Sequence, residues 1–173
     1  EPRRTRLLGQ NLVAERKKNG DLHVLEISVE GKVLAHCQVQ ENFGHVWTTL
    51  GKTTKPIFDI TEFQQLDRKY VGCGGVTVKA SALRVVENFL DIGHFPYVHT
   101  NILGSEPLTQ VNDYRAEIRS EIDEVWADDI TFHQDKAMLS AAGGQTTHYM
   151  YRVVSPFNTI LYKTCPEKPN EWD

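Results

Sequence analysis

Residues 80–99 restrict the fold of this chain more than any other segment, because a capping signal, helical spacing and a proline occur there together. Ser81 stands where a serine caps the start of a helix. The apolar residues that follow recur at helical spacing, at Leu83, Val86 and Leu90. We therefore predict a helix with one face toward a core. Pro96 is expected to end it, because the residue before a proline disfavours helical geometry.

Reactive side chains are expected on the other side of this helix. Glu87, Asp91 and His94 are spaced by four and three residues, which places them on one stripe. After Pro96 the chain leaves the helix, so His99 can turn back toward His94. Two imidazoles are then able to meet at one metal ion. The competing interpretation is an amphipathic helix with a charged outer face and two incidental histidines.

The pattern Asp-x-x-His-x-x-x-x-His, preceded by Glu87-Asn88, resembles the mononuclear iron motif of Rieske-type oxygenases. Over residues 83–104 the resemblance is to the vanillate demethylase branch. It implies that His94 and His99 bind Fe(II), whose open positions accept O2. It also implies that Asp91 binds a histidine ligand and lies on the route by which electrons reach the iron.

The third iron ligand of that family is a late carboxylate, well over a hundred residues beyond the second histidine. This sequence ends at Asp173, so we expect the third ligand beyond residue 173 and a catalytic domain that is incomplete at its C-terminus. Two imidazoles without that carboxylate would hold iron weakly. Three acidic residues would replace it only by coincidence: Asp113, Glu117 and Glu121.

Residues 1–52 alternate short apolar runs with turn signals at 9–10, 19–21 and 30–32, which predicts a small antiparallel β unit. The amino-acid sequence of this segment resembles the outer strands of a Rieske domain, with residues 38–51 as its closing strand. A Rieske cluster in this family needs Cys-x-His and Cys-x-x-His pairs. None of the three cysteines, Cys37, Cys73 and Cys165, begins such a pair. We predict a cluster-less Rieske-like domain with reduced thiols and no iron–sulfur cluster. The alternative is that the cluster loops exist in nature and are missing from this sequence.

Residues 53–75 are interpreted as a linker with a short helix at 60–66, and residues 76–173 as a partial mononuclear iron domain. In the latter we predict strands at 76–79, 114–122, 130–133, 137–141, 146–154 and 159–164, with turns at 128–129 and 155–156. The fold class is α+β, and the resemblance implies a helix-grip arrangement, a curved antiparallel sheet with a helix. Tyr149 and Tyr151 share a strand face as core or cavity lining, whereas His133 and His148 are interpreted as strand histidines, not ligands.

Composition excludes several function classes. A net charge of −4 and a pI near 6.0 give no general attraction to nucleic acid. No apolar run approaches the ~20 residues that a membrane helix needs, and the start has no signal-peptide core. We expect a cytoplasmic protein that does not bind membranes. The absence of an initiator Met suggests that part of the natural N-terminus is missing.

The resemblance implies a catalytic subunit that uses O2 and iron. Cluster-less subunits of this branch remove N-methyl groups, so we expect N-demethylation of a methylxanthine such as 7-methylxanthine. NAD(P)H electrons would arrive through a partner reductase that carries a Rieske centre. We also expect a trimer-like contact surface with other oxygenase subunits. The alternatives are an O-demethylase or hydroxylase of an aromatic acid, and a non-catalytic ligand-binding or scaffold subunit.

Overall fold

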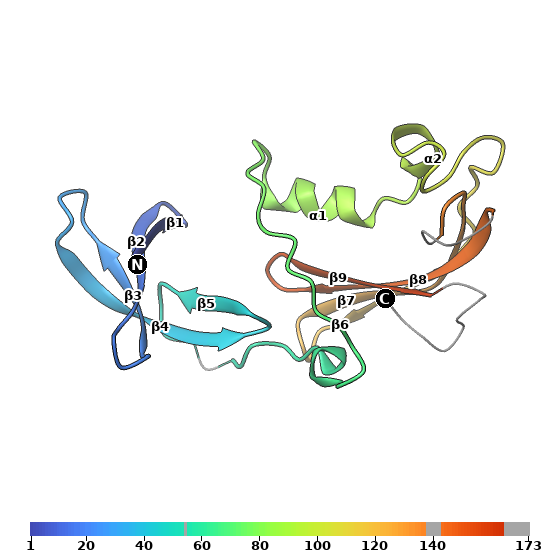
Figure 1. The fold of residues 1–173 in the computed structure, drawn as a ribbon. Helices are drawn as coiled ribbons and strands as arrows, with labels where there is room; N and C mark the ends of the chain where they lie inside the picture. Colours follow the sequence, from blue (N-terminus) through green and yellow to red (C-terminus); the bar gives the residue numbers. More distant parts are fainter. Residues whose placement is uncertain (54, 138–142, 165–173) are drawn as a thin grey trace. The chain divides into compact units, whose positions relative to one another are not determined.

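The computed structural model describes residues 1–53, 55–137 and 143–164, and the chain divides into two compact units, residues 1–73 and 74–173 (Figure 1). Parts of the sequence predictions fall outside these residues, namely most of the strand at 137–141 and Cys165. In the described ranges, no helix is long and apolar enough to cross a membrane. Cys37 and Cys73 are free thiols.

The N-terminal unit is a five-stranded antiparallel sheet whose strands follow sequence order (Figure 1). Its strands are β1 (Arg3–Leu7), β2 (Gln10–Arg16), β3 (Leu22–Ile27), β4 (Val33–Asn42) and β5 (His45–Thr49). The turns expected from sequence are present. Leu8 and Gly9 form the first turn, with φ values of 48° and 89°. Positive φ values at both positions let a two-residue turn match the twist of the strands that it joins.

The closing strand predicted at 38–51 is wrong as one strand, because the chain reverses at Phe43-Gly44 between β4 and β5. Both residues have positive φ, 51° and 68°. The turn places the Phe43 ring in the interior, where only 6% of the residue is exposed and where it contacts Trp47, Phe58 and Phe63. Burial of this ring is the physical reason for the break. The predicted helix at 60–66 is a single 3-10 turn, η1 (Thr61–Gln64).

The C-terminal unit contains a four-stranded antiparallel sheet, also in sequence order: β6 (Arg115–Arg119), β7 (Glu124–Gln134), β8 (Gln145–Val154) and β9 (Asn158–Thr164). The predicted turn at Asp128-Asp129 is wrong. The two residues form a bulge inside β7, where Asp129 has a φ of 61° and the pairing with β8 shifts between Ala127 and Ile130. The predicted strand at 76–79 is also wrong, because this exposed segment has no sheet partner among the described residues.

One face of this sheet forms the core of the unit. Six buried residues compose it, Ile92, Phe95, Ile130, Phe132, Tyr149 and Tyr151. Tyr149 and Tyr151 are each 2% exposed, so they are core residues in this unit. Helix α1 (Ala82–Leu90) lies against the sheet through its last turn, where the Phe89 ring meets the Tyr151 ring at a centroid distance of 5.6 Å. Two antiparallel sheets with few helices agree with the predicted β-rich, Rieske-like architecture.

A candidate metal site at the end of helix α1

Helix α1 begins as predicted. Ser81 caps it, because the Ser81 Oγ accepts the backbone N–H of Arg84 at 3.4 Å. The expected burial of Leu83 is wrong, since this residue is 68% exposed. The core is reached only at the far end of the helix, where Phe89 and Leu90 lie against it.

The end of α1 differs from the prediction. The helix stops at Leu90, and Asp91 has an extended ψ of 107°. Asp91 Oδ1 accepts the backbone N–H of Gly93 at 2.8 Å, and this local bond replaces the next helical one. The break turns both Ile92 and Phe95 into the core, where they are 4% and 8% exposed.

Pro96 starts a helix here instead of ending one. It lies in the first turn of α2 (Phe95–Val98), where a missing N–H costs nothing. His94 is the residue before this short helix and His99 is the residue after it. The backbone N–H of His99 donates to the carbonyl of Phe95 at 3.0 Å. One helical turn therefore separates the two histidines.

The two imidazoles face each other. Their ring centroids are 5.2 Å apart and their planes are inclined by 57°. Phe95 supports both, with its ring centroid 5.1 Å from that of His94 and 6.2 Å from that of His99. Phe95 in turn contacts the rings of Phe132 and Tyr149 in the core. The sheet thus fixes the position of the pair through one buried aromatic ring.

Asp91 orients the first of these rings. Its Oδ2 lies 3.2 Å from His94 Nδ1, and the carboxylate is half exposed whereas the His94 side chain is 17% exposed. A proton on Nδ1 that is donated to Asp91 leaves the Nε2 lone pair available to a metal. The predicted contact between Asp91 and His94 is confirmed. Glu87, expected on the same stripe, binds Arg84 instead.

The segment after His99 is tied to the end of β7. The Lys136 N–H donates to the Ile102 carbonyl at 3.0 Å, and Ser105 Oγ donates to Asp135 Oδ1 at 3.1 Å. Gly104 approaches the core so closely that an added Cβ would lie 2.9 Å from Cε1 of Phe132. These contacts hold the loop that carries His99.

The tyrosines beneath the site are neutral. Burial is the main cause that raises the pKa of Tyr151 to about 12, and the charge of Asp91 adds to it. Burial also raises the pKa of Tyr149, the neighbouring Tyr151 adds to this, and the Thr147 hydroxyl opposes it. Both phenols therefore keep their protons at physiological pH, and the floor of the site carries no charge.

The ring separation of the histidine pair allows the two side chains to serve as two ligands of a larger set. Imidazole nitrogens at about 2.1 Å from one metal place the ring centroids roughly 5 Å apart, as observed for His94 and His99. Within residues 1–53, 55–137 and 143–164, no group of three His, Cys, Asp or Glu side chains is able to hold a metal ion. The acidic residues considered as replacements lie in no such group, and Glu117 binds Arg119.

Sequence reasoning missed the residues that hold the pair together. The sequence pattern marks Phe95 only as the residue before a proline, and it assigns no role to Gly93 or Gly104. Gly93 does carry a local signal, because an aspartate side chain is able to accept the backbone N–H two residues later, and this bond favours a turn over a helix. The role of Gly104 had no local signal, since its neighbour Phe132 is distant in sequence.

Comparison with known proteins shows what the segment that contains the histidine pair is similar to. Residues 78–148, which include Asp91, His94 and His99, match the family described as the vanillate O-demethylase oxygenase C-terminal domain. The chain is also 44% identical over 131 residues to a protein of Pseudomonas sp. (strain TJI-51) described as a probable methylxanthine N7-demethylase NdmC. The alignment covers 76% of this chain and 46% of that protein, so the chain spans about half the length of this curated relative. The chain is therefore similar to the vanillate O-demethylase oxygenases over residues 78–148 and to this described N7-demethylase over 131 residues.

Proposed function

We propose that this chain belongs to the catalytic subunit of a Rieske-type non-heme iron monooxygenase that removes an N-methyl group from a methylxanthine. The observation that carries the proposal is the pair His94 and His99, facing each other at 5.2 Å inside the segment that matches the oxygenase family. The methylxanthine is suggested by the description of the 44% identical relative.

Iron(II) bound by His94 and His99 would supply the activation of O2. The chain's own residues prepare this site. Asp91 holds His94 in the tautomer that presents Nε2, and Phe95 keeps the two rings together. The described residues supply no third ligand beside the pair. We infer a helix-grip domain in which the sheet face with Tyr149 and Tyr151 underlies the substrate cavity.

The overall reaction requires an external electron source. Oxidation of an N-methyl carbon places one oxygen atom of O2 in a hydroxymethyl group, which leaves as formaldehyde, and the second atom becomes water with two electrons from NAD(P)H. The N-terminal unit has no Cys-x-His pair for a Rieske cluster. A partner reductase with its own Rieske centre would therefore deliver the electrons, and other oxygenase subunits would complete a trimer-like assembly.

Metal titration tests the site apart from turnover. The 173-residue chain is titrated anaerobically with Co(II), which is followed by visible absorption, and with Fe(II), which is followed by metal content after gel filtration. Both titrations should show weak binding. His94→Ala and His99→Ala should each reduce the affinity at least tenfold. His148→Ala, which removes an exposed histidine of β8, is the matched control. Equal binding by all four proteins would refute the site.

Substrate assays test the reaction with the longest natural form of the protein, a Rieske reductase and NADH. Formaldehyde from 7-methylxanthine is the expected result. The name of the matching domain family favours O-demethylation as the second candidate, and formaldehyde from a methoxybenzoate alone would select it. Formaldehyde from neither substrate would leave a ligand-binding or scaffold subunit.

A further inference from the structure

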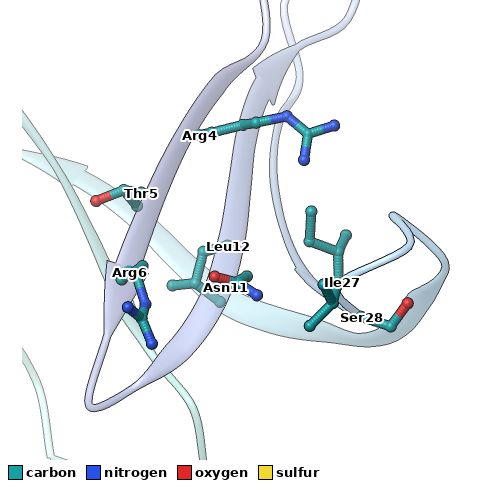
Figure 2. Close-up of a pocket in the computed structure, with 8 residues that line it drawn as sticks. Arg4, Thr5, Arg6, Asn11, Leu12, Ile27 and Ser28 are labelled. Carbon is teal, nitrogen blue, oxygen red and sulfur yellow. The ribbon is translucent and has the colours of Figure 1, made fainter.

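The N-terminal unit contains a pocket of about 420 Å³ along strands β1, β2 and β3 (Figure 2). Its lining joins two guanidinium groups to polar and apolar side chains, from Arg4, Thr5, Arg6, Asn11, Leu12, Ile27, Ser28 and Val29. Figure 2 shows the Arg4 side chain reaching across β2 toward Ile27, with Arg6 beside β1. The pocket is separate from the histidine pair, which belongs to the other unit.

The arginines of β1 differ from most of the other arginines in the described part of the chain. Arg3, Arg4 and Arg6 are exposed and form no ion pair there, and Arg6 only donates to the carbonyl of Gly9 at 3.1 Å. Five arginines elsewhere each bind a carboxylate, namely Arg16, Arg84, Arg115, Arg119 and Arg152. Three guanidinium groups thus lie on one strand without an ion-pair partner among the described residues.

Strand β1 is also an edge strand. Within the described residues it pairs only with β2. In this hairpin Leu7 and Gln10 close the two-residue turn and form a hydrogen-bonded pair. Hydrogen-bonded and non-hydrogen-bonded pairs then alternate along the two strands. Arg4 and Arg6 belong to non-hydrogen-bonded pairs, so their backbone N–H and C=O groups point away from β2, toward the open edge of the sheet. The residues whose side chains line the pocket therefore also offer their backbone to an added strand.

The remaining lining shows which kind of strand fits. Leu12 and Ile27 both line the pocket and are 1% and 6% exposed, and Ile27, which pairs with Asn11, lies on the sheet face of Arg4 and Arg6. The Asn11 amide beside them is a further polar group, whereas the Ser28 hydroxyl already donates to the Glu30 carboxylate at 2.7 Å. A strand with acidic side chains at every second position would place carboxylates opposite Arg4 and Arg6 on the pocket side.

We propose that β1 and its pocket bind an acidic, extended segment of a partner protein by strand addition, with Arg4 and Arg6 binding its carboxylates. Backbone pairing supplies affinity in this mode, and guanidinium–carboxylate pairing supplies selectivity. A second copy of this chain is a poor occupant, because two β1 strands side by side would bring their arginines together. This proposal does not depend on the iron site.

A peptide panel tests the proposal with the whole 173-residue chain. The probe is a fluorescein-labelled hexapeptide in which glutamate alternates with threonine, and binding is read by fluorescence anisotropy. A glutamine version removes the charge but keeps the shape. A version N-methylated at the glutamates keeps the charge but removes the backbone donors that pair with β1. Free glutarate serves as competitor to detect a site for small carboxylates alone.

We expect the acidic peptide to bind at least tenfold more tightly than the glutamine and N-methylated versions, with affinity that falls as NaCl increases. Arg4→Glu should weaken binding about tenfold or more, whereas Lys18→Glu, the same charge change at an exposed residue of the β2–β3 turn, should have little effect. Equal binding of the glutamine peptide, or equal effects of the two variants, would overturn the proposal. Binding of the N-methylated peptide or of glutarate as tightly as the acidic peptide would overturn strand addition.

Discussion

Replacement of Asp91 by asparagine would test how much the orientation of the His94 ring matters, because the variant keeps the ring but changes the group that orients it. The Asp91 carboxylate accepts two hydrogen bonds, from the Gly93 N–H at 2.8 Å and from His94 Nδ1 at 3.2 Å. An asparagine has one acceptor oxygen for these two donors. The shorter Gly93 bond should keep that oxygen, so the amide NH2 faces His94. The ring would then carry its proton on Nε2, where the metal needs a lone pair.

The size of the effect follows from the exposure of the carboxylate. A hydrogen bond to a charged group is worth about 1.5–3 kcal/mol when desolvated. The Asp91 side chain is 52% exposed, and water screens part of that interaction. A loss of roughly 1–1.5 kcal/mol corresponds to about tenfold in metal affinity, at the lower end of the ~10- to 100-fold typical of groups that orient a metal ligand.

Three measurements check this reasoning. Asp91→Asn should lower Co(II) and Fe(II) affinity about tenfold yet fill with iron at saturating metal, and ¹⁵N NMR should show His94 protonated on Nε2 instead of Nδ1. In the natural protein with its reductase, product formation should fall far more than iron content. Glu87→Gln, one helical turn earlier, is the control. Iron loss as complete as in His94→Ala would make Asp91 a direct ligand and refute the assignment.

Three further predictions concern the structure around the site. Gly104→Ala should destabilise the protein by about 1–3 kcal/mol in urea unfolding, because its Cβ would meet the buried Phe132 ring at 2.9 Å. Tyr149→Phe should change the free energy of unfolding by less than about 1 kcal/mol, because the contact of its buried hydroxyl with the Thr147 side chain falls short of a full hydrogen bond. Glu124→Gln should cost about 1–3 kcal/mol at pH 7, because it removes the negative charge that the partly buried Arg152 binds at 2.6 Å. The pKa of Glu124 is lowered chiefly by Arg152, so this contribution is present above the ordinary carboxyl pKa near 4.5 and should vanish as the pH falls through the lowered folded value.

Each of these predictions has a control or an outcome that would contradict it. Gly75→Ala is the control for Gly104→Ala, because it places a Cβ in open space and should be neutral. A loss above about 1.5 kcal/mol for Tyr149→Phe would show that its hydroxyl is satisfied in solution. If the stability difference between the natural protein and Glu124→Gln does not shrink below pH 4, the ion pair with Arg152 is not its source.

Local signals in the sequence predicted features that depend on neighbouring residues. The serine before the helix, the glycines in the turns of the first sheet and the alternation of β8 and β9 each act within a few residues, and the structure contains them. Asp91 and His94 were paired correctly for the same reason. Their contact needs only a separation of three residues near a helix end.

The sequence by itself thus determined which residues carry the candidate chemistry and most of the strands that support them. The tertiary structure decided where the helix ends, which apolar residues are buried and how the imidazoles meet. The helix ends at Leu90, Ile92 and Phe95 after it are both buried in the core, and their burial offsets the helical hydrogen bonds lost after Leu90. Phe95 can hold His94 and His99 together only because Phe132 and Tyr149, distant in sequence, meet it from the sheet.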